Sequence, residues 1–79
     1  TANINGEAID GTNIGATTPG TGVFSALTTS GYSITIQTTQ TPASASATGT
    51  TGEIAWDSNY IYVCVATDTW KRVAIDTWS

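Results

Sequence analysis

The most constraining feature of the sequence is a set of three short apolar segments between Glu53 and Ile75. They read Glu-Ile-Ala-Trp-Asp (53–57), Tyr-Ile-Tyr-Val-Cys-Val-Ala (60–66) and Trp-Lys-Arg-Val-Ala-Ile (70–75), with Ser-Asn and Thr-Asp-Thr between them. Each segment is rich in β-branched and aromatic residues and is bounded by turn-forming residues. This pattern predicts a three-stranded antiparallel β-meander.

The expected register of this meander gives it one apolar face. A two-residue turn at 58–59 places Ile54 opposite Val63, and a three-residue turn at 67–69 places Val63 opposite Val73. Directly opposed residues share a face. The predicted apolar face then contains Ile54, Trp56, Ile61, Val63, Val65, Val73 and Ile75, interrupted by Lys71. The mixed face contains Glu53, Ala55, Asp57, Tyr60, Tyr62, Cys64, Trp70, Arg72 and Ala74. We expect Ile54, Trp56, Ile61, Val63 and Val73 to lie in the core.

Three isoleucines near the start of the chain recur at a regular spacing. Ile4, Ile9 and Ile14 are five residues apart, a period that fits neither one face of a strand nor one face of a helix. Such a segment can bury its isoleucines against symmetry copies of itself, or it can be a flexible polar leader. Together with Phe24 and Leu27 from the next apolar patch, these residues are candidates for packing along a trimer axis.

The remaining segments suggest three regions. Tyr32, Ile34 and Ile36 alternate with polar residues, which predicts a strand at 31–37 with one buried face. Residues 38–52 are almost entirely small and polar and read as a connection, one long enough to cross a neighbouring subunit. The expected organisation is therefore an intertwined segment at 1–37, a connection at 38–52 and the meander at 53–79.

Composition points to self-association. A chain of 79 residues makes at most one small domain, and such domains usually need disulfides, a metal or oligomerisation. Cys64 is the single cysteine and histidine is absent, so we expect no internal disulfide, metal or cofactor. A net charge of −4 with two basic residues argues against nucleic-acid binding and against attraction to anionic membranes. No apolar run approaches the roughly 20 residues that a spanning helix needs, so we expect no membrane insertion. Because the chain starts at Thr1, we also expect it to be a piece of a longer protein.

Aromatic residues of the mixed face are the main candidates for binding. Tyr60, Tyr62, Trp70 and Arg72 could stack on a sugar ring, or they could form a subunit interface, where such residues are also enriched. Catalysis has weaker support. Without histidine there is no Ser-His-Asp arrangement, and the Glu53–Asp57 pair is more typical of a solvated surface. The chain is expected not to be an enzyme.

Two longer segments carry a resemblance to a known group of proteins. Residues 9–31, Ile-Asp-Gly-Thr-Asn-Ile-Gly-Ala-Thr-Thr-Pro-Gly-Thr-Gly-Val-Phe-Ser-Ala-Leu-Thr-Thr-Ser-Gly, resemble a motif of bacteriophage tail-fibre and other virion-fibre proteins. Residues 52–75 are similar to C-terminal segments of phage structural proteins. The resemblance implies an all-β, interwoven homotrimer on the exterior of a virion.

What this resemblance implies about function leaves three alternatives open. The first is a structural tail-fibre module for trimerisation or for the fibre tip. The second is a capsid-bound head fibre or decoration protein, and the third is a tip that recognises a host glycan during attachment. The expected partners are copies of the chain itself, other virion proteins and, for the third alternative, a host surface glycan.

Overall fold

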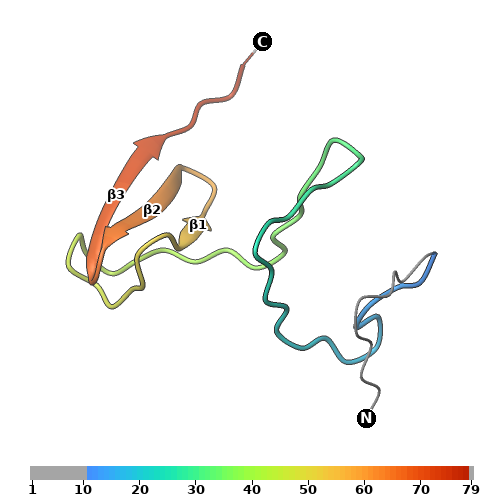
Figure 1. The fold of residues 1–79 in the computed structure, drawn as a ribbon. Helices are drawn as coiled ribbons and strands as arrows, with labels where there is room; N and C mark the ends of the chain where they lie inside the picture. Colours follow the sequence, from blue (N-terminus) through green and yellow to red (C-terminus); the bar gives the residue numbers. More distant parts are fainter. Residues whose placement is uncertain (1–10, 79) are drawn as a thin grey trace. The chain divides into compact units, whose positions relative to one another are not determined.

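The computed structural model describes residues 11–78, and their regular secondary structure is one antiparallel sheet with the order β1-β2-β3 (Figure 1). The strands are β1 (Ile54–Trp56), β2 (Tyr60–Ala66) and β3 (Thr69–Ala74). The described residues contain no helix, and hence none that could span a membrane. The all-β fold with its C-terminal meander is confirmed, whereas the interweaving of three chains stays a prediction.

The chain divides into two compact units, Thr1–Gly31 and Tyr32–Ser79. In the described part of the first unit, from residue 11, no strand forms and the large apolar side chains are exposed. Ile14, Phe24 and Leu27 are 77%, 69% and 64% exposed, while Ile4 and Ile9 lie outside the described residues. Packing of these five residues along a trimer axis therefore stays a prediction.

The turn between β1 and β2 has the predicted length and register, with Ile54 opposite Val63. Ser-Asn is a weak hairpin turn by itself, and the side chain of Asp57 compensates for this. Its Oδ1 accepts hydrogen bonds from the amides of Asn59 (2.8 Å) and Tyr60 (2.9 Å). Such bonds from an aspartate to the following backbone fix a turn locally.

The turn between β2 and β3 differs from the prediction. Only Thr67 and Asp68 lie between the strands, and the pairing is irregular between Cys64 and Ala66. Val63 therefore pairs with Lys71 rather than with Val73. Asp68 adopts the left-handed conformation, with φ of 53°, which aspartate tolerates better than most residues. The register error is two residues, so each side chain of β3 remains on its predicted face.

The strand predicted at 31–37 is absent from this chain. Tyr32 and Ile34 are 101% and 70% exposed, and no strand includes these residues. The segment contacts the sheet at β1 by other means: Trp56 donates from Nε1 to the carbonyl of Ile36 (2.8 Å), and the Gln40 amide donates to the carbonyl of Trp56 (3.0 Å). An alternating pattern makes a strand only where a neighbouring strand completes its hydrogen bonds.

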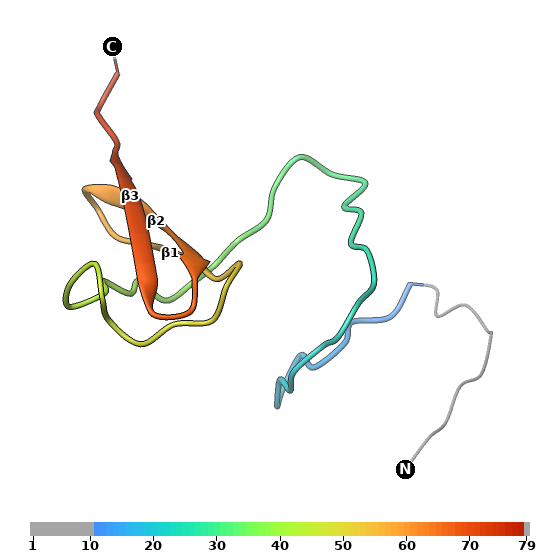
Figure 2. The same ribbon diagram turned by 60° about the vertical axis from the view of Figure 1, so that its left-hand side comes forward.

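The buried face of the sheet is also the opposite of the predicted one. Ala55, Tyr62, Cys64 and Trp70 of the mixed face form the core, each at most 6% exposed. The expected core residues of the apolar face are not buried: Ile54 and Val73 are each 59% exposed, and Trp56 is half-buried. The reason is that the connection at 38–52 folds back onto the mixed face of its own sheet (Figure 2).

Candidate functional site

Residues 40–52, called here the covering segment, are held by main-chain hydrogen bonds to both outer strands. Gln40 bonds to Trp56 at the edge of β1, and the Trp70 amide of β3 donates to the carbonyl of Ala45 (2.8 Å). The segment then returns to the sheet, where the Gly52 amide donates to the carbonyl of Cys64 (2.7 Å). The bonds to Trp56 and Trp70 satisfy groups of the outer strands that would otherwise be free, so a polar segment can cover the face without large apolar side chains.

Trp70 is the side chain on which the covering segment is built. Its indole Nε1 donates to the carbonyl of Ala47 (3.1 Å), and the side chain is 6% exposed. Gly49 lies directly on the ring. A Cβ atom there would be 2.7 Å from Cζ2 and 2.8 Å from both Cε2 and Nε1. The nearby Asp68 fastens Gly49 from the β2–β3 turn, because its Oδ1 accepts from the Gly49 amide (2.9 Å) and its own amide donates to the Gly49 carbonyl (3.0 Å).

Asp57 is the second organising side chain of this face. Besides the two turn amides, it accepts from the hydroxyl groups of Thr41 (2.6 Å) and Tyr62 (2.5 Å) at Oδ2. Hydrogen bonds to the ionised carboxylate, from Thr41 first and then Tyr62, hold the pKa of Asp57 far below its ordinary value. The same Asp57 carboxylate raises the pKa of the Tyr62 hydroxyl. Asp57 thus connects the covering segment, the first turn and β2.

Tyr60 and Arg72 form a cation–π pair on the same face. The guanidinium carbon of Arg72 lies 4.1 Å from the centre of the Tyr60 ring, and that ring lies 5.8 Å from the Tyr62 ring with a tilt of 46°. A guanidinium stacked in this way keeps N–H groups available for other acceptors. Arg72 itself remains exposed.

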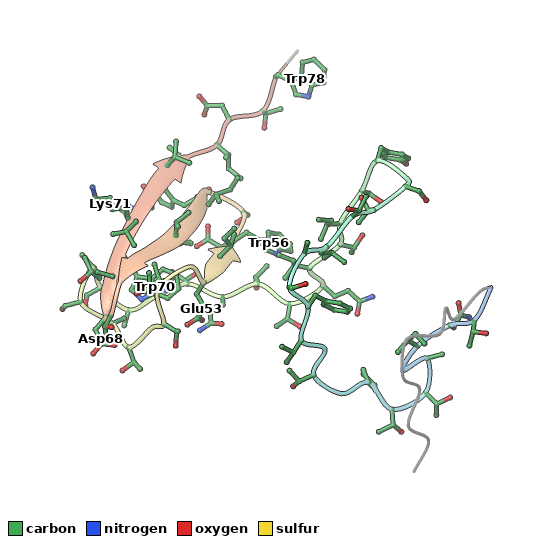
Figure 3. The ribbon with its side chains drawn as sticks, viewed as in Figure 1. Glu53, Trp56, Asp68, Trp70, Lys71 and Trp78 are labelled. Atoms are coloured by element: carbon green, nitrogen blue, oxygen red, sulfur yellow. The ribbon has the colours of Figure 1, made fainter. Side chains whose placement is uncertain are left out.

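A pocket of about 310 Å³ opens between the covering segment and β3. It is lined by Pro42, Ala43, Ser44 and Ala45 on one side, and by Tyr62, Trp70, Lys71 and Arg72 on the other. Figure 3 shows Trp70 and Lys71 on opposite sides of β3. Arg72 shares its face with Trp70, as strand alternation requires, so Arg72 is the basic side chain on the side of the sheet where the pocket lies.

The four residues predicted from the sequence to bind a glycan or form an interface do lie together, but they differ in how far they are exposed. Tyr62 and Trp70 are buried, with exposures of 4% and 6%, so neither presents a ring to stack on a sugar. Tyr60 is partly buried and carries Arg72 on its ring. Of the four, Arg72 is the residue open to a ligand.

Two contributions to this site were not predicted. The sequence predicts a solvated carboxylate at Asp57 and places residues 42–45 in a plain connection. The order Asp-Ser-Asn-Tyr at 57–60 was an available signal for the role of Asp57, because aspartate at the first position of a turn accepts from the following amides. No group of three His, Cys, Asp or Glu side chains within residues 11–78 could hold a metal ion.

Comparison with known proteins gives two short matches, both to proteins of bacteriophages. The chain is 57% identical over 42 residues to a protein named depolymerase 1, capsule K30/K69-specific, of Klebsiella phage K5-2. It is 51% identical over 37 residues to the depolymerase, capsule K30/K69-specific, of Klebsiella phage K64-1. The matches cover 53% and 47% of this chain but 5% of each relative. No family model and no solved structure matches the chain.

These matches indicate a phage tail-fibre-type protein and support a virion location in the broad sense. They do not assign the chain to a C-terminal module. They also correct one expectation of the sequence analysis. The chain was expected not to be an enzyme, yet both relatives are named depolymerases, which are enzymes. The absence of histidine excluded particular catalytic arrangements within 79 residues, and that argument does not extend to a protein of which this chain matches a twentieth.

Proposed function

We propose that this chain is a segment of a bacteriophage tail protein that depolymerises capsular polysaccharide, and that its meander assembles that protein by packing against copies of itself. The two phage relatives support the first half, since both are named capsule depolymerases. The second half is supported by the exposed side of the sheet.

The observation that carries the assembly proposal is an exposed aliphatic patch formed by Ile54, Ile61, Val63, Val73 and Ile75. These side chains are 37–59% exposed and come from all three strands and the residue after β3. Completing their burial would contribute roughly 1 kcal/mol each, about half the value of burying a whole aliphatic side chain. The covering segment already occupies the other face, so this patch is the apolar surface of the sheet left for a partner.

A second copy of the chain is the occupant we propose for the patch. The patch carries Lys71 as its one charge, opposite Val63, and offers no set of charges that would select a different partner. The exposed Ile14, Phe24 and Leu27 give the first unit an apolar surface of its own. Symmetric association buries both surfaces by one operation, and closed symmetry is usual for oligomers. The interwoven homotrimer is the form we propose.

Light scattering on the 79-residue chain at micromolar concentration tests the assembly proposal. We expect the native chain to be trimeric and Val63→Lys to dissociate it. Thr51→Lys, which adds the same charge to an exposed residue of the covering segment, serves as the control and should leave the trimer intact. A native chain that is a folded monomer under these conditions would overturn the proposal. Circular dichroism establishes that each variant is folded.

Enzymatic activity is tested separately with the complete protein. Purified complete protein is incubated with capsular polysaccharides, and the products are followed by size-exclusion chromatography. The expected result is a shift to lower mass for at least one capsule type. If every capsule tested, K30 and K69 among them, keeps its original size distribution, the depolymerase half of the proposal is wrong, whatever the oligomeric state.

A further inference from the structure

The pocket beside Arg72 has the size and charge of a small anion-binding site. We propose that it binds a carboxylate-bearing sugar, such as a uronic acid unit of a capsular polysaccharide, through the guanidinium and main-chain amide of Arg72. The choice of a sugar as the ligand rests on the proposed function; the choice of an anion rests on the pocket itself. Its volume of about 310 Å³ is at the small end of the range for ligand sites and suits one sugar unit.

The charge distribution favours an anion at this place. The chain has six acidic and two basic residues. Both basic residues line the pocket, and no acidic residue does. A local positive potential in an otherwise acidic chain attracts anions to that point and repels them elsewhere. Lys71 contributes at longer range, because its side chain starts from the other face of β3.

The main chain of β3 supplies a directed donor. The Trp70 amide donates outward to the covering segment, whereas the Ile75 amide donates inward to the carbonyl of Asn59 (2.9 Å). Because amide directions alternate along a strand, the Arg72 amide points to the same free edge as that of Trp70. The covering segment bonds to β3 at Trp70 and does not extend to Arg72, whose amide has no partner within residues 11–78.

The guanidinium supplies the second donor. Its stacking at 4.1 Å over Tyr60 limits its rotamers while leaving N–H groups at its edge, and it forms no ion pair with a described acidic residue. A carboxylate accepting from both the amide and the guanidinium would make charge-assisted hydrogen bonds, which are stronger than neutral ones. Pro42 and Ala43, which line the other side of the pocket, would contact the apolar side of the sugar ring.

An NMR titration of the ¹⁵N-labelled 79-residue chain tests this inference. Sodium glucuronate is the probe, and glucose is its neutral counterpart. We expect glucuronate to shift the amide signals of Arg72 and Ala43, and glucose to leave them unchanged. Arg72→Gln should weaken glucuronate binding about tenfold or more, the usual effect of removing a charged hydrogen-bond donor. Lys71→Gln removes a charge that acts at longer range and should weaken binding less than Arg72→Gln does.

Three results would overturn the inference. They are shifts of equal size with glucose, equal weakening by the two charge variants, and glucuronate shifts that persist unchanged in Ala43→Leu. The last variant fills the pocket without altering Arg72, so it decides the question if Arg72→Gln proves unfolded. Light scattering on the same samples reports assembly independently. A native chain that is trimeric but does not bind glucuronate would contradict only this inference. A native chain that is monomeric but binds glucuronate would contradict only the assembly proposal.

Discussion

Replacing Gly49 by alanine is expected to destabilise the meander through a single steric contact. The added Cβ atom would be 2.7–2.8 Å from three atoms of the Trp70 indole, whereas carbon atoms in contact are ordinarily separated by about 3.5–4.0 Å. Ring and backbone must therefore separate by roughly 1 Å. The backbone conformation of Gly49 lies outside the left-handed region, so conformational strain adds nothing to this cost.

Neither partner can move without losing other interactions. The Trp70 ring is buried and donates to the carbonyl of Ala47 at 3.1 Å, while Gly49 exchanges two hydrogen bonds with Asp68. Overpacking of a fixed core site typically costs about 1–3 kcal/mol. In a domain of this size, each 1 kcal/mol lowers the melting temperature by about 4–8 °C, so we expect Gly49→Ala to melt roughly 10 °C below the native chain.

Thermal unfolding followed by tryptophan fluorescence measures this change. Gly31→Ala is the matched control, because a Cβ atom at Gly31 meets nothing within 4 Å and its backbone is outside the left-handed region. That substitution should leave the melting temperature unchanged or raise it slightly. If Gly49→Ala melts with the native chain, Gly49 does not pack on Trp70 and the covering segment is not held as described.

Substitutions at three further residues test the polar contacts of the sheet and its turns. Because the pKa of Asp57 is held below its ordinary value of 3.8, its contribution to stability is complete above that pH and is lost as pH falls further; urea midpoints should show this loss in the native chain and not in Asp57→Asn. The pKa of the Tyr62 hydroxyl is raised, so its pH dependence runs the other way: its contribution to stability is present below pH 10.0 and is lost as the pH rises further. Tyr62→Phe should remove this alkaline dependence. Asp68→Ala should cost about 1–2 kcal/mol in urea unfolding, because alanine is strained at a φ of 53°, while Asp68→Gly should recover the conformational part of that cost.

The meander could be predicted from the sequence because its pattern is local. Three β-rich segments with turn residues between them fix strand number and order. The register error at the second turn is an even number of residues, so each side chain of β3 still lies on its predicted face. The second turn is shorter than predicted because Thr69, which was predicted to lie in the turn, begins β3. The left-handed Asp68 allows the shorter turn, and a conformation of one residue leaves little trace in a hydrophobic pattern.

The buried face could not be predicted from hydrophobicity, because the residues that cover it are not hydrophobic. The covering segment binds through main-chain groups of Ala45, Ala47 and Gly49, which every sequence possesses. Its side chains are small, and that smallness is what lets the backbone approach Trp70. The aliphatic face, which was predicted to be buried, is therefore the face that the single chain leaves exposed. Tyr62 and Trp70, two of the candidates for glycan binding, lie in the core instead.

Because the two faces are stabilised differently, their perturbations should respond differently to protein concentration. Contacts of Gly49 with Trp70 and Asp68 lie within one chain, so the destabilisation caused by Gly49→Ala should appear in the isolated chain as well as in an assembly. Val63 lies in the aliphatic patch, and stability gained by association depends on concentration. The melting temperature of the native chain should thus rise with concentration, as should that of Gly49→Ala, with a nearly constant gap between them. Val63→Lys should show no such rise. Parallel, concentration-independent melting of all three would mean that the patch is not an interface.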